Sequence, residues 1–175
     1  MQASTLNELK KELTHLSQKE LVEIITRLAR YKKENKELIT YLLSDVHDER
    51  GYINSVKAYI DEEIDAIPSD YNLYYAKKTL RKILRTVNKY CRYSGIKTTE
   101  VELLLHYLYR LRHSGIQIQK SQILTNVYEG QLKKVAKLLP TLHEDLQYDY
   151  GRQLLALELP HGTQGLLGGL LKKLR

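Results

Sequence analysis

Apolar side chains recur every three or four positions along most of this 175-residue chain, with polar residues between them. This spacing places the apolar residues on one face of a helix, so it predicts an all-α protein. The alternation of apolar and polar residues that indicates a half-buried strand is missing from the pattern, and we assign no sheet. The predicted helices cover about residues 5–13, 17–43 with a break or kink at Asn35, 51–67, 72–93, 99–112, 120–139 and 142–159.

The ends of these stretches carry residues that start and stop helices. Gly95 suits a left-handed C-cap, and Pro68 ends the helix before it. Three pairs have the Ser/Thr-x-x-Glu spacing of a capping box: Thr5 with Glu8, Ser17 with Glu20, and Thr99 with Glu102. Because the connections are short, we expect seven to eight antiparallel helices, arranged as a compact bundle or as a short α-solenoid-like stack of helix hairpins.

The composition of the chain also predicts its domain organisation and its cellular compartment. Residues 1–159 are predicted to form a single helical domain, and residues 160–175 form a Gly/Leu-rich basic tail that is mobile or docked. Cys91 is the one cysteine, which rules out a disulfide within the chain and fits a reducing compartment. The charged N-terminus lacks the apolar core of a signal peptide, and no apolar run reaches the roughly 18 residues of a membrane span. We therefore predict a cytoplasmic protein without a transmembrane segment.

The charges are distributed unevenly along the chain. Residues 71–97 carry eight Lys and Arg and no Asp or Glu, whereas residues 45–70 carry eight acidic and two basic residues. The basic character of the chain, net +7, therefore belongs to one predicted helix. Three interpretations of this helix stay open: a solvated or internally paired face, a site for an acidic protein, and a site for nucleic-acid phosphates.

The acidic stretch immediately precedes the basic one, which suggests internal pairing. An antiparallel hairpin would bring Asp61 near Lys77 and Glu63 near Lys78. Further along the helix, Lys82, Arg85 and Arg92 have no acidic cluster opposite them, whereas Lys89 would lie near Glu49. These residues and a flanking tyrosine form the predicted partner-binding face: Lys82, Arg85, Lys89, Arg92 and Tyr93.

This face predicts a non-enzymatic helical interaction domain that presents a basic, tyrosine-flanked helix to an acidic partner. The partner is an unknown protein or a second copy of the chain. The alternative is a nucleic-acid-binding protein that uses the same face on phosphates, with tyrosines available to stack on unpaired bases.

The opening of the chain, LNELKKELTHLSQKELVEIITRL at residues 6–28, resembles the start of a bacterial all-helical domain family of unknown function. Members open with a Leu-Lys-Lys-x-Leu helix, and Leu-Ser-x-x-Glu-Leu then leads into an Ile-rich helix. The matching positions are Leu9, Lys10, Lys11, Leu13, Leu16, Ser17, Glu20 and Leu21. The resemblance implies a cytoplasmic helical domain and supplies no activity or site residues. The tail after Pro160 departs from the family pattern.

Few residues have the spacing of a catalytic or metal site. Glu12 and His15 have the Glu-x-x-His spacing of di-iron bundles, but such a centre needs a second motif and two further glutamates. Glu102 and His106 lie four apart on one helix face, an arrangement that is usually a solvated polar face. Cys91, on the apolar side of the basic helix, is typical of a small buried hydrophobe.

An enzyme with a site around Glu102, His106 and Cys91 is thus a third interpretation, which no nucleotide-binding or nucleophile motif supports. We predict no catalytic residue, no metal, no cofactor and no small-molecule substrate.

Overall fold

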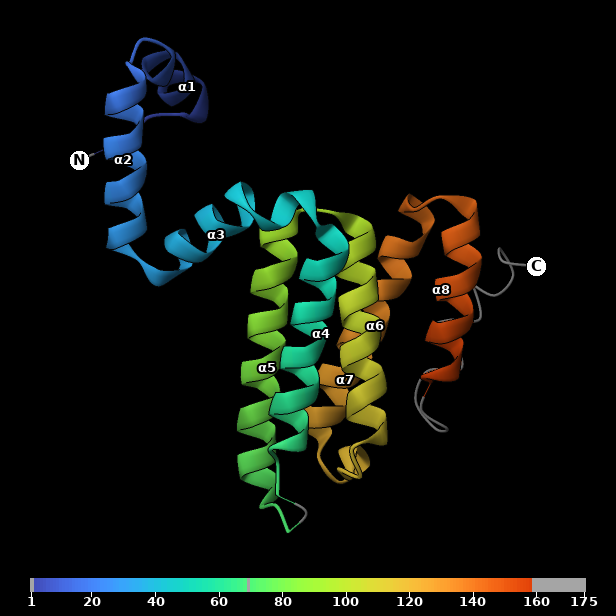
Figure 1. Cartoon of the computed structure of the whole chain (residues 1–175). Coiled ribbons are helices and arrows are strands. Elements are labelled where there is room, and N and C mark those ends of the chain that lie inside the picture. The colour runs from blue at the N-terminus through green and yellow to red at the C-terminus, as the bar shows by residue number, and fades with distance from the viewer. Residues whose placement is uncertain (1, 69, 159–175) are drawn as a thin grey trace. The chain divides into compact units, whose positions relative to one another are not determined.

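The computed structural model describes residues 2–68 and 70–158, which form helices joined by short loops, with no strand in these two ranges (Figure 1). The predicted all-α class is confirmed, and the eight α-helices of the described residues agree with the predicted seven to eight. The α-helices of the described residues are α1 (Leu6–Thr14), α2 (Gln18–Tyr31), α3 (Lys33–Leu43), α4 (Glu49–Asp65), α5 (Leu73–Ser94), α6 (Lys97–His113), α7 (Gln122–Leu138) and α8 (Glu144–Ala156). Three short 3₁₀-helices accompany them: η1 (Asp45–His47), η2 (Ile118–Lys120) and η3 (Leu139–Thr141).

The chain divides into two compact units, unit 1 (Met1–His47) and unit 2 (Asp48–Arg175). Unit 1 contains α1, α2, α3 and η1, and unit 2 contains the remaining helices. The tail predicted over residues 160–175 lies outside the described residues.

Two capping boxes start the helices of unit 1. The Thr5 hydroxyl accepts a hydrogen bond from the Glu8 backbone N–H (3.3 Å), and the Thr5 N–H donates to the Glu8 carboxylate (2.8 Å). Ser17 and Glu20 repeat the same pair of bonds at the start of α2. Both predicted boxes are confirmed, and each satisfies two N–H groups that the first turn of a helix leaves without partners.

The break between α2 and α3 lies at Lys32, three residues before the predicted position. Lys32 has an extended backbone (φ −143°, ψ 145°), so it ends one helix and precedes the next. Asn35, the predicted break, lies inside α3 and donates from Nδ2 to the carbonyl of Leu28 (2.9 Å). Its amide therefore links the first turn of α3 to the last turn of α2 instead of interrupting the helix.

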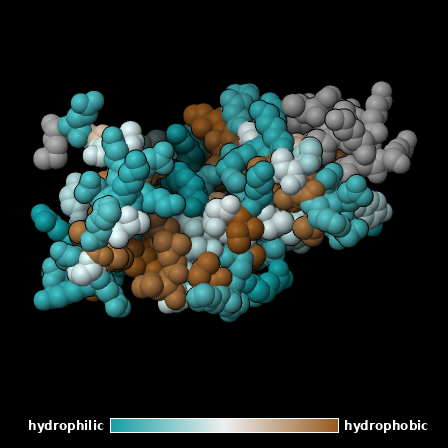
Figure 2. Space-filling view, turned by 90° about the horizontal axis from the view of Figure 1, so that it is seen from above, coloured by the Kyte–Doolittle hydropathy of each residue, from teal (hydrophilic) through white to brown (hydrophobic). Residues whose placement is uncertain are grey.

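Helices α1 and α2 contain no buried residue. Their large apolar side chains are exposed, and Leu28, for example, keeps half of its surface accessible. Figure 2 shows that hydrophobic side chains are visible at the surface among hydrophilic ones. The apolar stripe correctly predicted that these segments are helical, but its side chains are not buried in a core.

Unit 2 is a helical bundle in which α6 has the central position. α6 packs against α4, α5, α7 and α8, and Figure 1 shows it between α4 and α8. Its inward side chains are completely buried, among them Leu103, Leu104 and Leu108. Ile60 of α4 and Leu80 of α5 are equally inaccessible. The core of the molecule therefore lies around α6.

Tyrosines take the place of the missing phenylalanine and tryptophan in this core. Tyr107 is fully buried on α6, and its hydroxyl donates to the carbonyl of Leu80 (3.1 Å). Tyr128 of α7 donates to the carbonyl of Leu157 (2.7 Å). Burial raises the pKa of both phenols, that of Tyr128 to about 12, so both remain protonated hydrogen-bond donors.

The start of α6 differs from the predicted one. Gly95 has the expected left-handed conformation (φ 67°), but α6 begins at Lys97, and the predicted capping box of Thr99 and Glu102 does not form. The Thr99 hydroxyl donates to the Glu49 carboxylate (2.6 Å), and Glu102 binds side chains of α4. Partners from another helix have replaced the local partners that the spacing suggested.

Candidate partner-binding surface

The acidic end of α4 pairs mainly with α6. Asp61 lies 2.7 Å from His106 Nε2 and 2.8 Å from Arg110 Nε, and Asp65 lies 2.6 Å from Arg110 Nη2. The predicted partner of Asp61, Lys77, takes no part in these contacts. Because α4 packs against both α5 and α6, its acidic residues can form ion pairs with basic residues of either helix.

One acidic residue of α4 does pair with α5. Glu63 Oε2 lies 3.4 Å from Lys82 Nζ, one helical turn further along α5 than Lys78, the partner predicted from the hairpin. The Lys82 side chain is 60% exposed, so this ion pair contributes at most about 1 kcal/mol. Lys82 and Glu63 therefore form one ion pair between α5 and α4.

A groove runs along the side of α5 that faces α7. We call it the basic groove; it has a volume of about 500 Å³. It is lined by Tyr74, Lys77, Lys78, Arg81, Leu84, Arg85 and Asn88 of α5 and by Ile123 and Val127 of α7. Basic side chains from two turns of α5 thus stand beside a strip of apolar ones.

The four cations of the basic groove have no acidic partner in the described parts of the chain. Lys77, Lys78, Arg81 and Arg85 form no ion pair within residues 2–68 and 70–158. Lys78, Arg81 and Arg85 are exposed, and Lys77 is half-buried. Four like charges on consecutive turns repel one another, and an anionic partner would relieve that repulsion.

The predicted partner-binding residues are distributed over two sides of α5. Arg85 lines the basic groove. Lys82 pairs with Glu63, and the Lys89 ammonium lies 5.0 Å from the centroid of the Tyr90 ring and 5.8 Å from that of Tyr93. Lys89 and Tyr93 are therefore engaged with one another, as cation and aromatic face.

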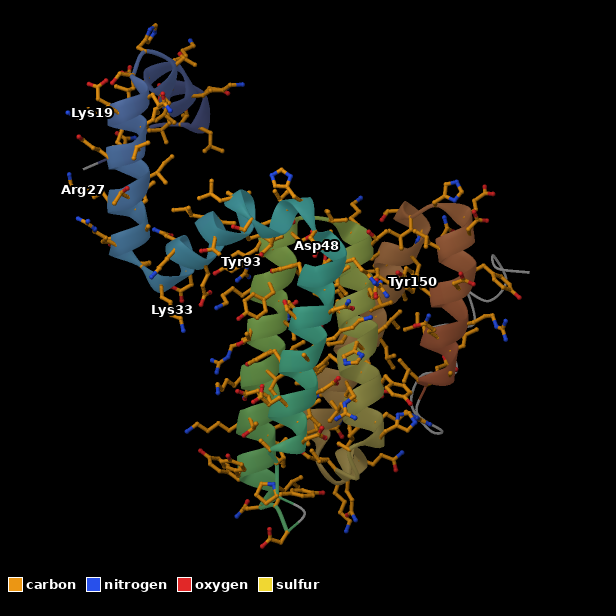
Figure 3. The ribbon with its side chains drawn as sticks, viewed as in Figure 1. Lys19, Arg27, Lys33, Asp48, Tyr93 and Tyr150 are labelled. Carbon is orange, nitrogen blue, oxygen red and sulfur yellow. The ribbon has the colours of Figure 1, made fainter. Side chains whose placement is uncertain are left out.

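The two remaining features of that prediction lie near the C-terminal end of α5. Arg92 is exposed there, and Tyr93, which Figure 3 labels, is half-buried. Lys77, Lys78 and Arg81 were not among the predicted residues. An antiparallel hairpin of α4 and α5 was expected to pair Lys77 and Lys78 with acidic residues of α4. The basic residues of α6, His106 and Arg110, are the sequence signal that could have corrected this assignment.

Glu102 and His106 line a second recess, at α4, α6 and α8. Glu102 Oε1 accepts from Lys57 Nζ (2.5 Å) and from Arg50 Nη1 (2.9 Å), and Oε2 accepts from the Tyr150 hydroxyl (3.4 Å). Burial raises the pKa of Glu102, but the hydrogen bond from Lys57 and the charges of Lys57 and Arg50 outweigh it, and the net pKa is lowered. The carboxylate is therefore ionised at neutral pH.

Cys91 lies elsewhere, in the core. It is 5% exposed, and burial, reinforced by the charge of Glu100, raises its pKa to about 12. A thiol with such a pKa is not a nucleophile at neutral pH. The interpretation of Cys91 as a small buried hydrophobe is confirmed, and the three residues of the enzyme interpretation do not meet at one site.

Within the described residues, no group of three or more histidine, cysteine or acidic side chains is arranged to hold a metal ion. No helix within residues 2–68 or 70–158 combines the length and the apolar character that crossing a bilayer requires. No family model, no curated protein and no solved structure matches the chain. The resemblance of residues 6–28 to a bacterial helical family stays a prediction.

Proposed function

We propose that this chain is a non-enzymatic helical interaction domain, and that the basic groove binds an acidic, amphipathic segment of a partner protein. The observation that carries the proposal is a set of four cations beside the apolar strip of the groove that form no ion pair within the described residues: Lys77, Lys78, Arg81 and Arg85. In this function Arg81 and Arg85 form ion pairs with acidic side chains of the partner, and Lys77 and Lys78 extend the same positive surface.

The apolar strip favours a protein segment over nucleic acid. Leu84, Ile123 and Val127 form the strip, and Ile123 keeps 49% of its surface exposed. An amphipathic helix covers such a strip with its own apolar side chains, which gains about 25 cal/mol for each Å² removed from water. Phosphates accept hydrogen bonds from basic and polar side chains, and they offer no apolar surface to cover the strip.

Fluorescence anisotropy with two probes tests the proposal. The first probe is a labelled amphipathic peptide of Glu and Leu, about 15 residues long, or four helical turns. The second is a labelled single-stranded DNA of about 16 nucleotides, the upper site size of a single-strand-binding module. We expect the peptide to bind more tightly near physiological salt, and the double variant Arg81→Gln/Arg85→Gln to weaken its binding by about tenfold or more.

A second variant separates the two kinds of partner. Ile123→Ser removes apolar contact without changing charge, so it should weaken peptide binding and leave DNA binding unchanged. The variant Lys10→Gln/Lys11→Gln removes the same two charges from α1 and serves as the matched control, with no expected effect on the peptide. Tighter binding of DNA, with an affinity that falls steeply as salt rises and no effect of Ile123→Ser, would replace the proposal with the nucleic-acid alternative.

We also propose a cytoplasmic location for this domain. The proposal is supported by Cys91, a free and buried thiol that a reducing compartment keeps intact. Fractionation of cells that produce the tagged chain tests it, and recovery of the chain in the culture medium or in the membrane pellet would contradict it.

A further inference from the structure

The recess beside Glu102 is separate from the basic groove and has a different chemical character. It has a volume of about 520 Å³, within the range of small-molecule sites. α4 contributes Arg50 and Lys57, α6 contributes Glu102 and its neighbours, and Tyr150 points from α8 toward α6 (Figure 3). All of these elements belong to unit 2.

The polar groups of the recess have more hydrogen-bond donors than acceptors. Both oxygens of Glu102 are occupied, one by Arg50 and Lys57 together and the other by Tyr150. Arg50 carries five N–H donors and Lys57 carries three, and Glu102 is the hydrogen-bond partner of one atom of each. The two cations and one carboxylate leave one excess positive charge, so a ligand that completes this arrangement brings a negative charge and acceptor oxygens.

Hydrogen bonds to Glu102 hold Arg50 and Lys57 at the recess before a ligand binds. The Lys57 side chain is 23% exposed, and its hydrogen bond to Glu102 restricts its conformation. The Arg50 side chain is 69% exposed, which leaves its guanidinium accessible from solvent. A guanidinium binds a carboxylate through two parallel N–H···O bonds, a geometry that an ammonium alone cannot supply.

The rest of the lining suits an apolar or aromatic body. Leu105 and Leu157 border the recess but are almost completely buried, so its accessible aromatic surface is the ring of Tyr109, a residue that is 53% exposed. The exposed ring of Tyr109 lies 4.2 Å from the ring of His113, measured between centroids. His113 Nδ1 donates to the carbonyl of Tyr109 (2.8 Å), because a carbonyl oxygen can only accept, and this bond fixes the imidazole beside the tyrosine.

We propose that this recess binds a small organic carboxylate, with its carboxylate on Arg50 and Lys57 and its apolar or aromatic body against the exposed ring of Tyr109. The site differs from the basic groove in its ligand as well as its position, because the groove offers a long row of cations and the recess offers one excess charge beside the ring of Tyr109. The recess is thus a small-molecule site on a domain whose proposed macromolecular partner binds at α5 and α7.

Titration of the ¹⁵N-labelled full chain with benzoate tests the proposal by NMR. We expect saturable amide shifts in the millimolar range that centre on residues 50, 57, 102, 105 and 109. Benzamide has nearly the same shape without the charge, so it should bind at least about tenfold more weakly. Arg50→Gln should weaken benzoate binding by a similar factor, and Lys57→Gln provides a second variant if the first one perturbs the fold.

Arg81→Gln is the matched control, since it removes one charge from the basic groove and should leave benzoate binding unchanged. The proposal is overturned if no saturable shift occurs at the recess, if benzamide binds as well as benzoate, or if the shifts lie on α5 and disappear with Arg81→Gln. Failure of the acidic peptide to bind would contradict the proposed function and leave these outcomes unaffected, because Ile123 and Arg81 do not line the recess.

Discussion

Helices α2 and α6 are both amphipathic by sequence, yet α2 buries none of its residues and α6 buries eight. The apolar residues of α2 form a single stripe that includes Leu21, Ile24 and Leu28. In α6 the three consecutive leucines at positions 103–105 place apolar side chains on several sides of the helix. A helix that is apolar on several sides can pack against several neighbours at once, whereas one stripe can pack against only one surface.

The formation of a helix and the formation of a core therefore depend on different features of the chain. Capping boxes and apolar spacing are local signals, and unit 1 has both of them in full. Burial requires a second apolar surface of matching shape, which α6 finds in its neighbours within unit 2. Most of the free energy of unfolding should therefore reside in unit 2.

The largest expected difference is between equivalent leucine truncations in the two units. Leu108→Ala removes a completely buried side chain from α6 and should lower the free energy of unfolding by about 2–5 kcal/mol. Leu28→Ala removes the same atoms from a side chain that is 50% exposed and should change it by about 0.5 kcal/mol or less. Urea unfolding of the full chain measures both values.

Tyrosine fluorescence is a suitable probe for that experiment. Twelve of the fourteen tyrosines follow residue 48, so the signal reports mainly on unit 2. Circular dichroism at 222 nm reports on helices of both units and serves as the second probe. Equal losses for Leu108→Ala and Leu28→Ala would mean that α2 is buried in solution, and the contrast between the two units would then be wrong.

A smaller difference is expected from two hydroxyl deletions. Tyr107→Phe removes the buried hydroxyl that donates to the Leu80 carbonyl and should cost about 0.5–1.5 kcal/mol. Tyr31→Phe removes a hydroxyl from a ring that is 75% exposed in unit 1, and no measurable change is expected. If Tyr107→Phe left the free energy of unfolding unchanged, this hydrogen bond would add nothing to the stability that burial of the ring already provides.

The local features of this fold could be predicted from the sequence because they depend on neighbours in the chain. The helices, the capping boxes of Thr5 and Ser17, and the left-handed Gly95 all follow from spacing within a few residues. Pairing between helices could not be predicted in the same way. Asp61 contacts α6 where α5 was expected, because the direction in which α4 presents its acids depends on how three helices pack together.

At the candidate site, too, the features that depend on packing between helices could not be predicted from the sequence. The basic helix was evident from composition alone, and Arg85 belongs to both the predicted face and the observed groove. Arg81 was not predicted, because no sequence rule indicated that α7 would border that side of α5. Glu102 was predicted as a capping residue, but Lys57 and Arg50 of α4 offered a charged partner that outweighed a local backbone bond.

The smallest expected effect concerns two glutamates whose pKa values are both lowered. Glu20 is held by its own capping box in unit 1, through its bonds with Ser17, and Glu102 is held across helices by Lys57 and Arg50. A lowered pKa in the folded state means that the contribution to stability is present above the unfolded value of 4.5 and is lost as pH falls through the folded value. Removing Glu102 therefore matters at neutral pH and not in acid.

We expect Glu102→Gln to lower the free energy of unfolding of unit 2 by at most about 1 kcal/mol at pH 7, because water still reaches both of its cationic partners. The difference from the unchanged protein should shrink as pH falls below about 4.5 and disappear once the native carboxylate is protonated. Glu20→Gln should leave the tyrosine-detected transition unchanged at every pH, since glutamine also completes a capping box and unit 1 contributes few tyrosines. A difference for Glu102→Gln that persisted in acid would show that the side chain acts through packing, and the charge assigned to Arg50 and Lys57 would then not be what holds α4 to α6 at this point.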